Sequence, residues 1–150
     1  MASQESELIK LYSKRILALA ADIPHLRLLD APQARVMKRS PLCGSTVTVD
    51  LVLEAGRIAA FGQEVKACAL GQASAAVFGQ QAIGRTRAEV ERLRTELRNM
   101  LKYGADAPGD PFQGYEVLAP AMEYKNRHAS IMLVPEATLA AFDEIAAAVG

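Results

Sequence analysis

The sequence contains no tryptophan, and aromatic residues make up only 5% of its 150 positions. So few aromatic side chains argue against a stacking platform for single-stranded nucleic acid. Neither sign of charge is in excess, since 17 lysines and arginines balance 17 aspartates and glutamates. Binding to phosphate backbones depends on a basic excess or stripe, so we expect no nucleic-acid partner.

Long hydrophobic runs are also missing. No apolar stretch approaches the roughly 20 residues that a membrane-spanning helix needs, so we expect no membrane partner. Residues 1–7 contain two glutamates and no basic side chain, which is unlike a signal or transit peptide. We therefore expect a cytoplasmic protein, and the length predicts a single domain over residues 1–150.

Hydrophobic periodicity predicts an α+β fold in which a small antiparallel sheet of about three strands packs against several helices. Strands are expected over residues 34–39, 46–54 and 57–67, with a tight turn at residues 55–56 and a bulge at Gly62. Helices are expected over residues 3–20 and 69–83, and a capping box at Thr86 opens another. Helical segments follow over residues 115–122, 126–134 and 135–149, with Pro135 in the first turn of the last one.

The predicted hairpin brings the two cysteines together. If residues 55–56 form a two-residue turn, the extended ladder places Cys43 opposite Cys68, and a bulge at Gly62 would still leave them neighbours. Cys68 also lies where a strand becomes a helix, and the positive end of a helix dipole favours a thiolate.

Such a pair of thiols suits several kinds of chemistry. Two thiolates near a helix N-terminus are suited to binding a soft metal, carrying sulfur or undergoing redox reactions. The alternative is a pair of small buried apolar side chains that happen to be close. Two ligands alone are too few for a zinc or iron–sulfur site, because such sites usually have about four.

Three motifs resemble those of the IscU/NifU N-terminal family, the scaffolds on which iron–sulfur clusters are built. Pro41–Ser45 resembles the family's Pro-x-Cys-Gly-Asp motif, and Cys68–Ala75 is similar to its second motif, in which Ala-Ser-Ala follows a cysteine. Arg127–Leu133 is similar to the third motif, in which a cysteine precedes a leucine-bearing helix. Tyr12 fits the N-terminal pattern of the SufU-like branch, and the resemblance covers essentially the whole chain.

The sequence departs from this pattern at two positions. Ser45 stands where the family has an aspartate, and Ser130 stands at the place of the missing third cysteine. The resemblance implies a zinc ion or a 2Fe–2S cluster held by Cys43 and Cys68. His128 is the best candidate for an additional ligand, whereas Ser130 and Ser45 are weak candidates, because a serine hydroxyl stays protonated near neutral pH.

The resemblance also implies a function. Such a scaffold receives sulfur from a cysteine desulfurase, gathers iron and passes a nascent cluster to acceptor proteins, without turning over a substrate. We therefore expect a non-enzyme. No catalytic triad, phosphate loop or metalloprotease motif points to a hydrolase.

Three alternatives remain open. A degenerate paralogue would bind and regulate a desulfurase or a true scaffold without holding a cluster. A redox or persulfide-relay protein would work through Cys43 and Cys68 alone. A homodimer would complete a four-sulfur site with two thiolates from each chain. Near the Cys43 loop, Arg35, Lys38 and Arg39 would either favour the thiolate or contact an acidic partner.

Overall fold

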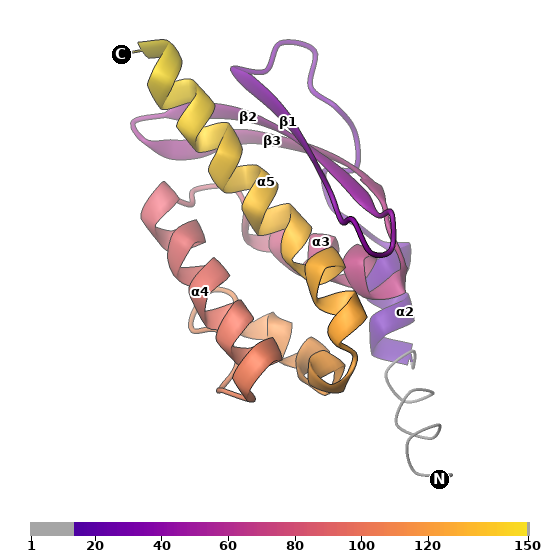
Figure 1. Cartoon of the computed structure of the whole chain (residues 1–150). Helices are drawn as coiled ribbons and strands as arrows, with labels where there is room; N and C mark the ends of the chain where they lie inside the picture. The colour runs from indigo at the N-terminus through magenta and orange to yellow at the C-terminus, as the bar shows by residue number, and fades with distance from the viewer. Residues whose placement is uncertain (1–13, 150) are drawn as a thin grey trace, which may run out of the picture.

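The computed structural model describes residues 14–149 and contains one antiparallel sheet with strand order β1-β2-β3 (Figure 1). Helix α5 lies across β1 and β2, and helices α3 and α4 pack against α5. The elements in chain order are α2 (Lys14–Ala21), β1 (Ala34–Arg39), β2 (Thr46–Glu54), β3 (Arg57–Lys66), α3 (Ala69–Gln81), α4 (Arg87–Tyr103), the 3-10 helix η1 (Gln113–Glu123) and α5 (Lys125–Val149). The predicted α+β class is confirmed.

The strands follow the expected alternation. Val47, Val49 and Leu51 of β2 are buried, and β1 and β2 have the predicted bounds. The β2–β3 register shifts at Ala59, so the predicted bulge at Gly62 is wrong. Position 62 needs a glycine for a different reason, because a Cβ there would collide with the carbonyl oxygen of Arg27.

The helix boundaries also follow local chemistry. The hydroxyl of Thr86 accepts the backbone N–H of Glu89, and the Glu89 carboxylate accepts the backbone N–H of Thr86, so the predicted capping box opens α4. The helix ends at Gly104, whose φ of 72° lies in the left-handed region that favours glycine. The helix predicted over residues 3–20 is described only from Lys14 onward, and Tyr12 lies outside the described residues.

Helix α5 is continuous through Pro135, so the prediction of two separate helices is wrong. Proline has no N–H to donate to the carbonyl four residues earlier, which is that of Ile131. The hydroxyl of Ser74 on α3 donates to this carbonyl oxygen at 2.6 Å. A side chain from the neighbouring helix therefore satisfies the group that the proline leaves open.

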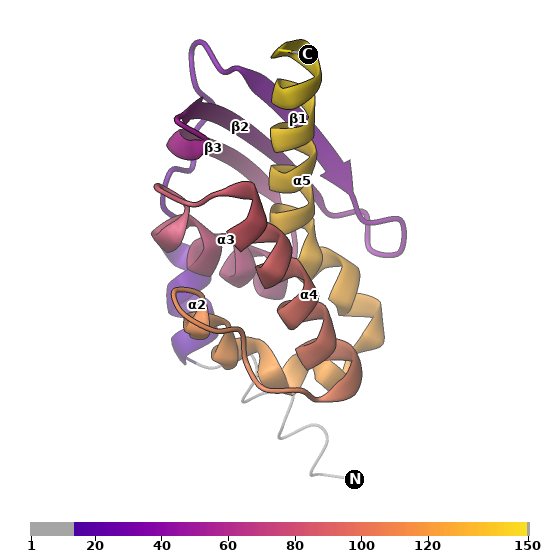
Figure 2. The same cartoon turned by 90° about the vertical axis from the view of Figure 1, so that its left-hand side faces the viewer.

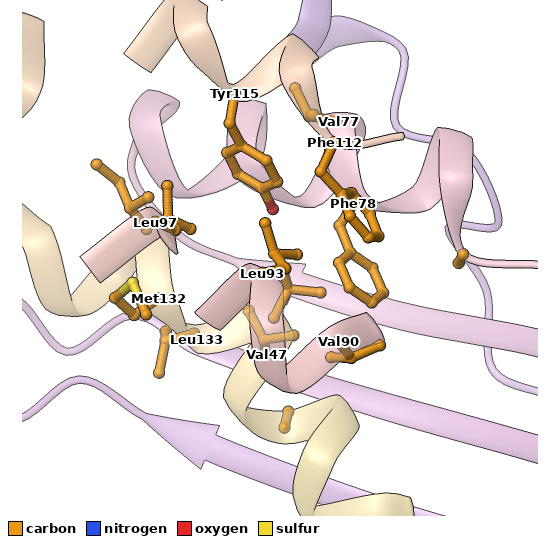
Figure 3. Close-up of a cluster of buried hydrophobic side chains, with 14 of the residues drawn as sticks. Val47, Val77, Phe78, Val90, Leu93, Leu97, Phe112, Tyr115, Met132 and Leu133 are labelled. Atoms are coloured by element: carbon orange, nitrogen blue, oxygen red, sulfur yellow. The ribbon is translucent and has the colours of Figure 1, made fainter. Parts of the chain in front are cut away.

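A buried core joins the helices to the sheet (Figure 3). The rings of Phe78 and Phe112 stack at 5.5 Å, and Tyr115 is fully buried beside Phe112. The Tyr115 hydroxyl donates to the backbone carbonyl of Ser74 at 2.9 Å. Through this contact η1 is tied to α3 beside the point where α3 meets α5. Between residues 14 and 149, no helix is long and apolar enough to cross a membrane.

Candidate functional site

Cys43 lies on the loop between β1 and β2. The backbone N–H of Ser40 donates to the carbonyl of Ser45 at 2.8 Å, and the N–H of Gly44 donates to the carbonyl of Ser40 at 2.9 Å. Gly44 has a φ of 71°, which a side chain would disfavour. Ser40 and Ser45 are buried, whereas Cys43 is exposed. The loop therefore holds a thiol at the surface above two buried hydroxyls.

Cys68 is the N-cap residue of α3 and is half-buried. Its side chain makes no capping hydrogen bond, and its Sγ lies 3.6 Å from Oγ of Ser130 on α5. Gly71 permits this approach, because a Cβ there would lie 2.5 Å from Oγ of Ser130. The absence of a side chain at position 71 thus brings α3 and α5 together at the site.

A chain of hydrogen-bond contacts joins the two cysteines. Sγ of Cys43 lies 3.3 Å from Oγ of Ser45, and the hydroxyl of Ser130 donates to Oγ of Ser45 at 3.1 Å. Ser130 in turn contacts Cys68. The four positions that correspond to the motif ligands therefore meet at one place, although they come from a hairpin loop, α3 and α5.

Buried hydroxyls change the acidity of one thiol. The neutral thiol of Cys43 donates to Oγ of Ser40 at 3.2 Å. Once the proton leaves, hydroxyls can rotate and donate to the sulfur. Hydrogen bonds from Ser40 and then Ser45 lower the pKa of the Cys43 thiol to about 7. A large fraction of Cys43 is therefore thiolate at neutral pH, which is the nucleophilic form.

The structure does not bring His128 into contact with the two cysteines. Its Nε2 lies 2.9 Å from the carbonyl oxygen of Ala121 and 3.1 Å from that of Met122, at the end of η1. His128 precedes Ser130 by two positions, and residues so spaced point in different directions from a helix. Its ring contacts backbone carbonyls of η1, while Ser130 faces the cysteines.

The described part of the chain holds no group of three or more histidine, cysteine, aspartate or glutamate side chains placed to bind a metal ion. Ser45 and Ser130 supply hydroxyls at positions where a carboxylate and a thiolate would be ligands. Hydroxyls hydrogen-bond to sulfur readily but coordinate zinc or iron poorly at neutral pH. The arrangement favours a reactive thiol over a complete metal centre.

Sequence reasoning missed Ser40. The residue is fully buried and contacts Cys43, yet the motif gives it no role. The β1–β2 register offers a signal, because the pairing of Arg39 with Thr46 continues to Ser40 and Ser45. Two small hydroxyl residues facing each other beside a cysteine would have pointed to a thiol-stabilising loop.

Comparison with known proteins decides the family. A crystal structure of a nitrogen-fixing NifU-like protein (N-terminal) from Brucella abortus superimposes with a TM-score of 0.90 and 38% sequence identity. It covers 94% of this chain, and the match spans 98% of that protein. The chain belongs to the NifU-like N-terminal family. A scan of family models and a search of curated proteins found no match.

Two more solved structures share the fold of this NifU-like chain. One is a putative iron–sulfur cluster assembly scaffold protein for the SUF system from Fervidobacterium islandicum AW-1, with a TM-score of 0.76 and 21% identity. The match covers 88% of this chain and 96% of that one. The other is a hypothetical protein with a TM-score of 0.71 and 20% identity, matched over 85% of this chain and 96% of its own length.

Proposed function

We propose that this NifU-like protein takes part in iron–sulfur cluster assembly by carrying sulfur on Cys43 and passing it to a partner. The observation that carries the proposal is an exposed thiol with a pKa of about 7, joined through two hydroxyls to a second cysteine. The resemblance of the motifs makes a cysteine desulfurase the expected donor. The protein acts as a carrier in the cytoplasm, where thiols stay reduced.

The transfer needs no oxidant. The Cys43 thiolate attacks the outer sulfur of a persulfide on the donor protein, and the sulfur–sulfur bond of the donor breaks. A new sulfur–sulfur bond forms on Cys43, which becomes a persulfide, and the donor cysteine leaves as a thiolate. Ser40 and Ser45 stabilise the attacking thiolate through their hydroxyls. Cys68 lies at the other end of the hydroxyl chain as a second thiol for onward transfer.

Mass spectrometry of the intact protein tests this step. After incubation with a cysteine desulfurase and cysteine, the wild-type chain should gain the mass of a sulfur atom in a reductant-sensitive form. Cys43→Ser should lose the gain, whereas Cys68→Ser should retain it on Cys43. Equal labelling of Cys43→Ser and wild type would contradict the role of Cys43. No labelling of the wild type would contradict the proposal as a whole.

A second function is favoured by the meeting of both sulfurs at one site. Cys43 and Cys68 would bind zinc or an iron–sulfur cluster as cargo, with the remaining ligands supplied from outside the chain by a second copy or by a partner. Native mass spectrometry with zinc, and separately with ferrous iron and sulfide, should then show one metal centre per dimer. A metal-loaded monomer would contradict the dimer. If the wild type takes up neither sulfur nor metal, a regulatory paralogue that binds a desulfurase or scaffold is the better account.

A further inference from the structure

A cleft of about 630 Å³ lies beside the Cys43 loop, between the C-terminal half of α4 and the N-terminal half of α5. Helices α4 and α5 run side by side at this position (Figure 2). Ser40 and Pro41 form the end of the cleft nearest to Cys43. Because Oγ of Ser40 is 3.2 Å from Sγ of Cys43, this end of the cleft adjoins the loop that carries the reactive thiol.

The cleft is lined by more cations than anions. Arg39, Arg98, Lys102 and Lys125 are exposed around it, and Glu136 is the only carboxylate among the described residues that line it. Among the described residues, none of these four cations forms an ion pair. The chain as a whole has no net charge. The positive potential is therefore local to this face, and the cations remain available to a partner.

The positive strip continues along the same two helices. A neighbouring hollow shares Arg98 and Glu136 with the cleft and adds Lys38, Arg94 and the ion pair of Arg87 with Asp143. Nε of Arg94 is buried and has no hydrogen-bond partner. The two hollows together place cations along the face that α4 and α5 share.

The floor of the cleft is apolar. Leu101 of α4 and Met132 and Leu133 of α5 line it, and all three also belong to the hydrophobic core, where Figure 3 labels Met132 and Leu133. Tyr103, which is 69% exposed, adds an aromatic wall. An occupant that matches this lining carries carboxylates toward the rim and an aliphatic or aromatic side chain toward the floor.

We propose that this cleft binds an acidic peptide segment with an apolar anchor, which belongs to the protein that exchanges sulfur with Cys43. The partner's role rests on the proposed function, whereas the charge and shape of the cleft do not. A docked segment raises the local concentration of the partner's reactive sulfur at Cys43. A nucleic acid fits less well, because the apolar floor cannot form ion pairs or hydrogen bonds with phosphates and Glu136 repels them.

Fluorescence anisotropy with a labelled peptide of alternating glutamate and leucine tests the cleft directly. The peptide should bind the wild-type protein, and binding should weaken with salt. The Arg98→Glu/Lys102→Glu variant should weaken it about tenfold, because two attractive charges become repulsive. The matched control, Arg15→Glu/Lys14→Glu, reverses two exposed cations on α2 and should bind like the wild type. Circular dichroism confirms that both variants fold.

Several outcomes would overturn the proposal. These are equal binding by the two charge-reversed variants, equal binding of a peptide with serine in place of leucine, and stronger binding of a single-stranded oligonucleotide at the same salt concentration.

A second experiment distinguishes a failure of the docking proposal from a failure of the proposed function. Arg98→Glu/Lys102→Glu should raise about tenfold the desulfurase concentration that half-saturates sulfur transfer to Cys43, with an unchanged rate at saturation. An unchanged half-saturating concentration overturns the docking role. Cys43→Ser should bind the peptide normally and accept no sulfur. Peptide binding by a wild type that accepts no sulfur would contradict the proposed function while leaving the cleft as an acidic-peptide site.

Discussion

The two cysteines stand at opposite ends of one hydrogen-bonded chain, yet their surroundings differ. Cys43 is exposed on a hairpin loop and rests on two buried hydroxyls, which lower the pKa of its thiol to about 7. Cys68 is half-buried at the start of a helix and contacts a single hydroxyl, that of Ser130. The thiol of Cys43 is therefore accessible to a reaction partner, whereas the thiol of Cys68 is partly shielded from solvent. Solvent access and the number of hydroxyl donors distinguish them.

The hydroxyls that link the two ends occupy the positions at which the motif resemblance leads us to expect metal ligands. Ser45 and Ser130 donate to or accept from sulfur and each other, and both are almost fully buried. A carboxylate and a thiolate at these positions would bring negative charge that only a cation could balance. With serines there, the two cysteines can remain close without a metal.

The largest change is expected from restoring the two ligands. A Ser45→Asp/Ser130→Cys variant places a carboxylate and a third thiolate beside Cys43 and Cys68. Zinc affinity, measured by competition with a chelator, should rise about a hundredfold or more over wild type, because each added ligand contributes to metal binding. The control is the same variant with Cys68→Ala, which removes one ligand again. Equal zinc affinity of the wild type and the restored variant would show that the four positions do not converge on a metal.

A smaller effect should distinguish the Cys68 end of the hydrogen-bonded chain from the Cys43 end. Gly71→Ala places a methyl group against Ser130, so α3 and α5 must shift at the Cys68 end, and the hydroxyl that Ser130 donates to Ser45 shifts with them. We expect a net loss of about 1–2 kcal/mol in the free energy of unfolding by urea, because overpacking outweighs the gain in helix propensity. The midpoint of Cys43 alkylation should move less than in Ser40→Ala, because Ser40 lowers the pKa of Cys43 most and Ser130 lowers it least. A stability at or above that of the wild type, or a Cys43 midpoint that moves as far as in Ser40→Ala, would contradict this division.

The smallest effect concerns the acidity of Cys43 itself. Its alkylation rate by iodoacetamide should rise with pH through a midpoint near 7, because only the thiolate reacts. Ser40→Ala removes the strongest stabilising hydroxyl, so the midpoint should move to higher pH and the rate at pH 7 should fall about three- to tenfold. Ser45→Ala should shift the midpoint less. Thr48→Ala, on β2 and away from the sulfurs, is the control, and an equal shift in this variant would refute the mechanism.

Local sequence patterns predicted much of the fold. Alternation predicted β2, a short basic apolar run predicted β1, and the capping box at Thr86 predicted the start of α4. The continuity of α5 was not predictable in this way, because Pro135 is tolerated through a hydrogen bond from Ser74, which lies 57 positions from Ile131. The bulge was predicted at Gly62 but lies at Ala59. Patterns in a short stretch of sequence do not predict contacts between residues that are far apart in the chain.

The candidate site shows the same limit. Motif positions predicted which residues to consider, and the structure brings together Cys43, Ser45, Cys68 and Ser130. The hydrogen bond between Ser45 and Ser130 spans 85 positions, so no local pattern indicates it. The orientation of His128 toward backbone carbonyls of η1 depends likewise on how two helices meet.

The hydrogen bond from Ser74 to the carbonyl of Ile131 has a consequence for how such a site can diverge. It fixes α5 to α3 next to Ser130, and a slide by one helical turn, about 5.4 Å, would break it. The backbone of α3 and α5 is therefore held in place by Ser74 and Ile131, which are not among the four clustered residues of the site. Side chains at the four clustered positions can be exchanged without moving that backbone. One architecture can in this way present different side chains at the same site by substitution alone.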